Sequence, residues 1–346
     1  PMPPLPVKSS GVLFERGARK LGLHPYPAPM AIVSQPYRGR PACINCGFCM
    51  GFGCEVMAKS STLFTMIPEP EATCRCEVRS ESYVFRIDTD GRGRASGVAY
   101  YDGKRRELFQ KARAVVVAAN GAETARLLLN SSSPRFPQGL ANSSGLVGKY
   151  LMFNYTSRVG GVFEHELNEY KSVQVTRILQ DYYDSDPKRG FYGGGGMDAR
   201  IGPGPVTWAL QNAERQPAWG PEFKAHLREY ARSVVVACHG TSLPLETNSV
   251  SLDPELKDAW GVPAMRVTYR DHPDDLAFGR FQQARGEEIL QAAGAQKTWL
   301  LPVGESALAF HLLGTCRMGD DPQKSVVDRY HRAHDVPNLF VCDGSS

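Results

Sequence analysis

Several features that would assign a protein to a class are missing from this sequence. No stretch of its 346 residues approaches the roughly 18 consecutive apolar residues of a membrane-spanning helix, and no charged segment followed by an apolar one marks a secretory signal. One sign of charge does not dominate, since 40 lysines and arginines stand against 36 aspartates and glutamates. The small excess is scattered and gives no indication of nucleic-acid binding. With 42% hydrophobic residues, the chain can nevertheless form a substantial core.

The two ends lack the features of natural termini. The chain begins at Pro1 without a methionine, and it stops at FVCDGSS (340–346), an apolar strand that runs into a turn. We therefore expect a fragment of a longer polypeptide, truncated at both ends. The missing secretory signal then says little about location.

The nine cysteines are odd in number, which argues against a framework in which every cysteine is paired. Four of them fall within CINCGFCMGFGC, as Cys43, Cys46, Cys49 and Cys54. Zinc sites usually use two Cys-x-x-Cys pairs with a longer segment between them. A compact Cys-x-x-Cys-x-x-Cys loop is typical of iron–sulfur sites. An iron–sulfur cluster is favoured, and zinc, disulfides or free structural thiols remain as alternatives.

Short-range patterns predict both strands and helices. Residues 76–110 alternate in polarity around two Asp-Gly turns, which predicts a small antiparallel β-meander. A long helix is predicted over 273–293, because a proline and two aspartates open it and Gly294 follows it. Residues 1–42 are rich in proline and are expected to form an extended, loop-rich segment.

One stretch reads as a strand, a turn and a helix in succession. Residues 115–117 are wholly apolar, as in a parallel strand that is buried on both faces. The turn Asn120-Gly121 follows, and then a helix over 122–129 that carries Glu123 in its first turn. This combination is half of a doubly wound nucleotide-binding unit, although many α/β proteins contain such units.

The carboxy-terminal region carries the most specific pattern. FHLLGTCRMG at 310–319 is followed by SVVDRYHRAHDVPNLFVCDGSS at 325–346. Together these segments resemble the carboxy-terminal signature of the glucose–methanol–choline (GMC) flavoprotein oxidoreductases. Three further stretches are similar to segments of the same family: ARAVVVAANGAETARLLLNSS, SSGLVGKYLMFN and NSVSLDPELKDAWGVPAMRVTY.

The resemblance implies a fold class and a division into domains. The fold is an α/β, Rossmann-like flavin-binding domain that is discontinuous, with an inserted α+β substrate domain built on an antiparallel sheet. The implied flavin domain is partial and covers 1–155 and 306–346, with the cysteine loop at 43–54 and the meander at 76–110. Residues 156–305 then form the substrate domain.

The resemblance also implies FAD as the cofactor and a histidine as the catalytic base. Oxidation of an alcohol needs a base for the hydroxyl proton, and an imidazole with a pKa of roughly 6.5 suits that role at neutral pH. His311 therefore becomes the predicted general base, and a structural histidine that caps a turn is the alternative. The predicted cofactor-binding residues are Asn120, Gly121, Glu123, Asp343 and Gly344.

Two parts of the family pattern are absent from this chain. The amino-terminal Gly-x-Gly-x-x-Gly that seats the ADP half of FAD is missing, and so is the second active-site residue that follows Asp-Gly-Ser-Ser. Because the other motifs are intact, truncation explains both losses better than decay. We expect that the chain by itself neither holds FAD tightly nor turns over.

The cysteine loop is similar to that of the gluconate, sorbitol and fructose dehydrogenase large subunits within this family, some of which bear a [3Fe–4S] cluster. The resemblance favours [3Fe–4S] over [4Fe–4S], with Cys43 as the spare thiol. It also implies an alcohol, sugar or polyol substrate and electron transfer to a cytochrome or quinone. A cytochrome c and a small subunit are possible partners, and a periplasmic or partner-mediated membrane location is the expectation.

Two other functions stay open from the sequence. The first is an FAD-dependent alcohol or sterol oxidase that uses dioxygen and has a structural cysteine loop. The second is a non-catalytic electron-transfer or binding subunit that kept the fold.

Overall fold

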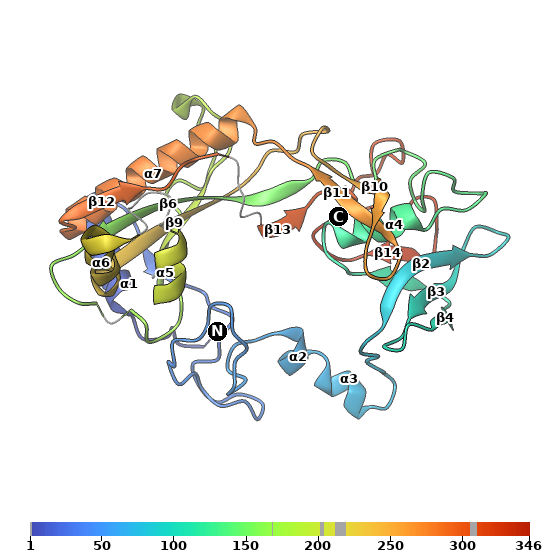
Figure 1. Ribbon diagram of the computed structural model, residues 1–346, viewed down its shortest axis with the longest axis horizontal. Helices are drawn as coiled ribbons and strands as arrows, with labels where there is room; N and C mark the ends of the chain where they lie inside the picture. The colour runs from blue at the N-terminus through green and yellow to red at the C-terminus, as the bar shows by residue number, and fades with distance from the viewer. Residues whose placement is uncertain (1, 168, 201–203, 212–218, 305–309) are drawn as a thin grey trace. The chain divides into compact units, whose positions relative to one another are not determined.

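The structure, a computed structural model, describes residues 2–167, 169–200, 204–211, 219–304 and 310–346 (Figure 1). The chain divides into two compact units. Unit 1 comprises Pro1–Glu77, Thr156–Gly240 and Pro273–Gly304, and unit 2 comprises Val78–Tyr155, Thr241–His272 and Glu305–Ser346. Compactness does not identify which parts bind a flavin, so the predicted domain assignment stays a prediction. Its boundary at 305 and 306 lies outside the described residues.

Unit 1 is built on an antiparallel sheet with the strand order β1-β7-β8-β9-β6-β12. The strands are β1 (Tyr26–Pro27), β6 (Met152–Val162), β7 (Arg177–Leu179), β8 (Gly195–Arg200), β9 (Ser233–Thr241) and β12 (Lys297–Leu300). Strand β6 is long and continues into unit 2 at its start. Along β8 and β9, side chains alternate between the two faces, as in any extended strand.

Two helices cover one face of this sheet. They are α1 (Ser9–Lys20) and α7 (Pro273–Ala293), and α7 runs along the strands in Figure 1. Phe14 of α1 and Ile289 of α7 are buried in one core cluster with side chains of β6, β8 and β9. The predicted long helix is therefore confirmed.

The prediction of an extended segment over residues 1–42 is wrong where α1 forms. The prolines of this segment lie at or before Pro6 and again from Pro25, so the residues between them are free to form a helix. A Cβ at Gly17 would clash with the Ile289 carbonyl, so glycine lets α1 pack directly against α7.

The remaining helices of unit 1 are short. Two follow the cysteine loop, and two lie between β8 and β9 in the sequence, where Trp208 packs edge-on against Trp299 at 5.5 Å. Their bounds are α2 (Thr62–Thr65), α3 (Pro68–Ala72), α5 (Pro205–Gln211) and α6 (Gly220–Glu229), with 3-10 turns η1 (Pro187–Arg189) and η2 (Tyr230–Arg232).

Unit 2 contains the predicted meander and the strand–turn–helix unit, and both are confirmed. The meander consists of β2 (Tyr83–Thr89), β3 (Ala95–Tyr101) and β4 (Glu107–Lys111). The buried strand is β5 (Val115–Val117), and α4 (Glu123–Asn130) follows it.

The other strands of unit 2 complete the neighbourhood of β5. Strand β14 (Leu339–Val341) pairs with β5 in parallel, and β10 (Ser249–Lys257) and β11 (Pro263–Thr268) form an antiparallel hairpin beside α4 (Figure 1). Strand β13 (Phe310–Leu313) pairs with the start of β6. A core cluster under β5, α4 and β14 includes Val117, Leu128 and Val341.

Candidate active site

Two strand ends meet at one edge of unit 2. Because β5 and β14 run parallel, with Val117 opposite Val341, their carboxyl ends point the same way. Asn120 and Gly121 follow β5, and Asp343 and Gly344 follow β14, so four of the residues predicted from sequence come together here. The carboxyl ends of parallel strands are where open α/β sheets place ligands.

The Asp343 carboxylate fastens the two turns to each other. Its Oδ2 accepts hydrogen bonds from the Asn120 backbone N–H (3.0 Å) and from Thr124 Oγ1 (2.5 Å). Its Oδ1 accepts from the backbone N–H and the hydroxyl of Ser345, at 2.8 and 2.5 Å. The chain's own donors thus occupy both carboxylate oxygens, which favours a role in positioning the turns.

Asn120 closes the amino-terminal end of α4. Its side-chain oxygen accepts from the backbone N–H groups of Ala122 (2.9 Å) and Glu123 (3.2 Å), which have no partner inside the helix. Asn120 has a φ of +87°, a left-handed conformation that asparagine tolerates better than most residues. Glu123 itself makes an ion pair with Arg126 at 3.4 Å.

A third segment, Leu312–Thr315, packs against both turns. A Cβ at Gly121 would lie closer than 3.0 Å to the Leu312 carbonyl oxygen, and one at Gly344 would lie 2.5 Å from it. The Gly314 N–H donates to the Gly344 carbonyl at 3.0 Å, and Thr315 Oγ1 donates to the Gly121 carbonyl. The backbone N–H groups of Gly121 and Gly344 donate to no other described residue. They are suitable donors for a phosphate or for a polar edge of a cofactor.

Substituting alanine for Gly121 is expected to lower the free energy of unfolding by about 2–3 kcal/mol, because the new methyl group would overlap a backbone carbonyl that cannot move alone. Urea unfolding measures the change. Gly91→Ala is the matched control, since a Cβ there meets nothing within 4 Å and its cost should stay within about 0.5 kcal/mol. An equal loss of unfolding free energy in both variants would contradict the close approach of Gly121 to the Leu312 carbonyl.

His311 lies at an irregularity in strand β13. The register with β6 shifts between Phe310 and Leu313, and His311 has a φ of +58°. A bulge of this kind re-aims a side chain, and a left-handed non-glycine residue is strained unless its surroundings hold it. The imidazole is exposed and makes no hydrogen bond to another described residue, so the described part of the chain leaves its nitrogens available to a ligand.

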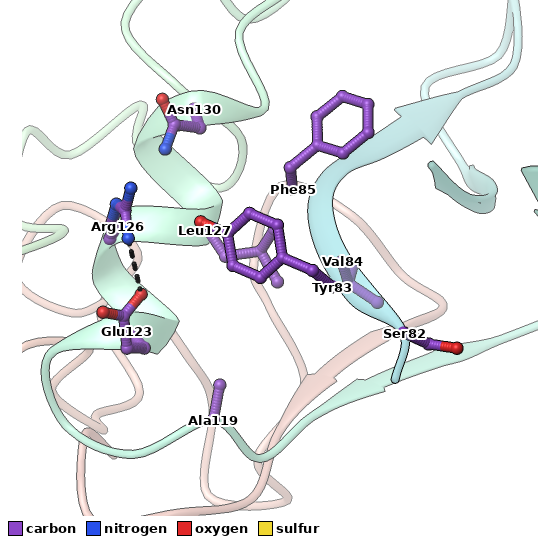
Figure 2. Close-up of a pocket in the computed structure, with 9 residues that line it drawn as sticks. All are labelled: Ser82, Tyr83, Val84, Phe85, Ala119, Glu123, Arg126, Leu127 and Asn130. Carbon is purple, nitrogen blue, oxygen red and sulfur yellow. Dashed lines mark hydrogen bonds and ion pairs between the residues drawn. The ribbon is translucent and has the colours of Figure 1, made fainter. Parts of the chain in front are cut away.

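A cavity of about 310 Å³ lies beside α4 and the first strand of the meander. Figure 2 shows the Tyr83 ring of β2 extending toward Leu127 and the Glu123–Arg126 pair on α4, with Val84 and Phe85 next along the strand. Its lining is largely apolar, with charge at one end only. Such a cavity suits a flat ligand that has one polar edge.

The Asp258 carboxylate ties this cavity to the β10–β11 hairpin. It accepts from Tyr83 Oη and from the Arg126 guanidinium, both at 2.7 Å. Partial burial opposes ionisation of Asp258, but the hydrogen bonds from Tyr83 and Arg126 hold its pKa down at about 2. Burial and the same hydrogen bond raise the pKa of Tyr83 to about 12.

Asp258→Asn is expected to lower the free energy of unfolding at pH 7 by about 2 kcal/mol, since a depressed folded-state pKa means that the ionised group stabilises the fold. This stabilisation is present above the unfolded pKa of about 3.9 and is lost as the pH falls towards the folded value of about 2. The difference between wild type and variant in urea unfolding should therefore shrink between pH 4 and pH 2. If the difference in unfolding free energy between wild type and variant stays constant with pH, the loss of stability comes from packing and not from the charge of Asp258.

The cysteine loop belongs to unit 1 and has no regular secondary structure. The Lys59 ammonium closes it by donating to the carbonyls of Cys49 and Phe52, each at 2.8 Å. Phe48 and Phe52 pack edge to face at 5.6 Å and remain exposed. The loop borders a cavity of about 590 Å³.

The loop thiols have different environments. Burial and the neighbouring thiols of Cys43 and Cys46 raise the pKa of Cys49. Burial opposes ionisation of Cys54 too, but the backbone N–H groups that follow it, with that of Lys59 at 3.4 Å, hold its pKa below the usual value.

All nine cysteines are free thiols. Among the described residues, no three His, Cys, Asp or Glu side chains converge where they could ligate one metal ion. The thiols as placed therefore do not fit a closed iron–sulfur or zinc centre.

Two family models match most of the chain. A GMC oxidoreductase amino-terminal model matches residues 9–154, and a GMC oxidoreductase carboxy-terminal model matches residues 244–346. The chain belongs to the GMC oxidoreductase family. The resemblance noted in the sequence is thereby confirmed.

Curated relatives of this GMC oxidoreductase include three dehydrogenases. The 2-methyl-1,2-propanediol dehydrogenase of Mycolicibacterium austroafricanum is 36% identical, with 99% of this chain and 63% of that protein covered. The gluconate 2-dehydrogenase flavoprotein of Pantoea cypripedii is 28% identical (99% and 59% covered). The fructose dehydrogenase large subunit of Gluconobacter japonicus is also 28% identical (100% and 62% covered). The chain thus spans about three fifths of the length of these relatives.

Solved structures of two oxidases share the fold. Pyridoxine 4-oxidase from Mesorbium loti matches with a TM-score of 0.55 at 17% identity, covering 76% of this chain and 52% of that one. Formate oxidase from Aspergillus oryzae RIB40 matches with a TM-score of 0.55 at 15% identity, covering 83% and 58%. The predicted fold class, an α/β flavoprotein fold with an antiparallel sheet, is confirmed.

Several residues of this GMC oxidoreductase that shape the site were not predicted from its sequence. Thr124 and Ser345 are the donors that hold Asp343, and Asp258 joins the hairpin to Arg126. A signal for Asp258 existed, because Asp-x-x-Gly is typical of a turn whose first residue accepts backbone hydrogen bonds. Of the helices that the structure describes, none has the length and apolar character needed to cross a membrane.

Proposed function

We propose that the full-length protein is an FAD-dependent alcohol dehydrogenase that acts on a sugar, polyol or other small hydroxylated molecule. The observation that carries this proposal is His311, an exposed imidazole at a strand bulge whose next residue, Leu312, packs against both strand-end turns. The relatives named as dehydrogenases of a diol, of gluconate and of fructose support the substrate class.

The residues at the strand ends fit a flavin nucleotide. The backbone N–H groups of Gly121 and Gly344, which donate to no described residue, can bind its phosphate or carbonyl oxygens, while Asn120 and Asp343 hold both turns in place. FAD, when bound, accepts the hydride that leaves the carbinol carbon. An imidazole nitrogen of His311 takes the hydroxyl proton of the same alcohol.

The electron acceptor is part of the proposal. The sequence favours a [3Fe–4S] cluster in the cysteine loop and transfer to a cytochrome or quinone, with a small subunit and cytochrome c as partners in the periplasm or at a membrane. Since the described thiols do not fit a closed centre, we derive no step through a cluster. Iron analysis of anaerobically purified full-length protein tests the cluster: about three irons per chain would show that the loop thiols rearrange to bind one, and no iron would leave them as free thiols.

The proposal is tested by mixing the FAD-loaded, full-length protein anaerobically with a panel of diols, polyols and sugars. At least one is expected to bleach the visible flavin absorbance, and an artificial acceptor is expected to restore it without peroxide. Peroxide production on admission of air would establish an oxidase instead. No bleaching by any alcohol, with FAD bound, would support a non-catalytic subunit.

A further inference from the structure

The antiparallel sheet of unit 1 presents two different faces. Val159 of β6, Met197 of β8 and Val236 of β9 all lie in the core cluster with α1 and α7, so one face is apolar and covered by helices. Because side chains alternate along a strand, the residues next to these point to the opposite face. On that face, which is opposite the helix-covered core, Arg200 and His239 are partly exposed, and we call it the accessible face.

The accessible face carries a cluster of charged side chains. Asp198 is buried and accepts hydrogen bonds from Arg200 Nε (2.5 Å) and from His239 Nε2 (2.8 Å). A second guanidinium nitrogen of Arg200 contacts both the other Asp198 oxygen and the His239 ring. Asp198 thus holds Arg200 and His239 in fixed positions and neutralises one positive charge.

A further cation in this cluster has no counter-ion among the residues that the structure describes. Arg158 on β6 is half-buried, yet its guanidinium makes no ion pair and donates no hydrogen bond to any residue that the structure describes. Loss of hydration and the positive charge of Arg200 lower its pKa, while Asp198 acts in the opposite direction. Asp198 is thus ion-paired with Arg200, and its charge acts on Arg158 without a direct contact between the two side chains.

Such an arrangement is costly without an anion. A partly desolvated guanidinium that has no partner among the described residues loses hydration free energy that no contact in the described part of the chain returns. Its planar fork of five N–H groups matches two oxygens of a carboxylate or phosphate. The third nitrogen of Arg200, which Asp198 does not engage, offers further donors at the same place.

We propose that Arg158, assisted by Arg200, forms an oxyanion-binding site on the accessible face of the unit 1 sheet, for the carboxylate or phosphate group of a small molecule. Asp198 and His239 position Arg200 and do not contact the ligand. The site goes beyond the proposed alcohol oxidation, because it adds a charge requirement that a neutral polyol cannot meet.

The test compares ligands that differ in a single group. Binding of D-gluconate, D-glucitol and D-glucitol 6-phosphate to the full-length protein is measured by calorimetry, with the flavin chemically reduced so that no turnover occurs. At least one of the two anions is expected to bind roughly 10-fold to 100-fold more tightly than glucitol, and added salt should reduce this preference. Whichever anion shows the preference identifies carboxylate or phosphate as the group.

Variants assign the preference to this site. Arg158→Gln is expected to abolish it, and Arg158→Lys to keep part of it, since lysine retains the charge without the fork. Arg16→Gln is the matched control, because Arg16 is an exposed arginine on α1 of the same unit. Equal binding of both anions and glucitol to the wild type would overturn the proposal without any variant. A preference that survives Arg158→Gln would overturn it as well.

The outcome is independent of catalysis. If the alcohol panel reduces the flavin but no anion preference is found, the oxyanion site fails and the dehydrogenase proposal stands. If the anion preference is found and no alcohol reduces the flavin, the oxyanion site stands and the dehydrogenase proposal fails.

Discussion

Replacing His311 with alanine is expected to slow flavin reduction by an alcohol about 10²- to 10⁴-fold, the usual contribution of a general base. The imidazole is exposed and makes no hydrogen bond within the described chain, so its removal should leave the fold and the bound FAD intact. Rapid mixing under anaerobic conditions measures the loss, because it follows reduction of the flavin before any acceptor is involved.

The backbone at this position calls for a second variant. His311 has a φ of +58°, which alanine adopts at a cost of about 1–2 kcal/mol, whereas asparagine tolerates it better. His311→Asn should therefore be as slow as the alanine variant while unfolding like the wild type. His165→Ala is the control, since His165 is an exposed histidine in unit 1. Reduction within about twofold of the wild-type rate in both His311 variants would assign the proton to another group.

Asp343→Ala is expected to lower the free energy of unfolding by about 3 kcal/mol and to weaken FAD binding. Four donors lose their acceptor at once: two from Ser345, one from Asn120 and one from Thr124. The turns that follow β5 and β14 then lose the link that holds them together. Urea unfolding measures the first effect, and flavin content after gel filtration measures the second.

A smaller carboxylate clamp in the same unit provides the comparison. Asp335 accepts only two hydrogen bonds in the described structure, from the backbone N–H and hydroxyl of Ser143, at an exposed site. Asp335→Ala should cost about 1 kcal/mol or less and leave FAD content unchanged. Asp343→Asn should lose much of the stability too, because its amide group would face two donors. An Asp343→Ala protein as stable as the wild type would show that the turns are held by other contacts.

Local patterns determined much of this fold from sequence. The alternation and Asp-Gly turns of residues 76–110, the apolar run at 115–117 and the capped helix over 273–293 each depend on neighbours within a few residues. The helix at Ser9–Lys20 lies between proline-rich flanks that by themselves predict an extended segment, and its stability comes from packing on α7, far along the chain.

The sequence by itself determined which residues are candidates, and the tertiary structure decided which of them act together. His311, Asn120-Gly121 and Asp343-Gly344 were recognisable in their motifs, but residues 120 and 343 meet only because β5 and β14 pair in parallel. The bulge that re-aims His311 depends on its register with β6. Likewise, Arg158, Asp198 and His239 lie on three strands of one sheet, and the alternation of side chains along each strand places them on the face opposite the core cluster. Charge and propensity are local properties of a chain, whereas proximity between distant segments is fixed by packing.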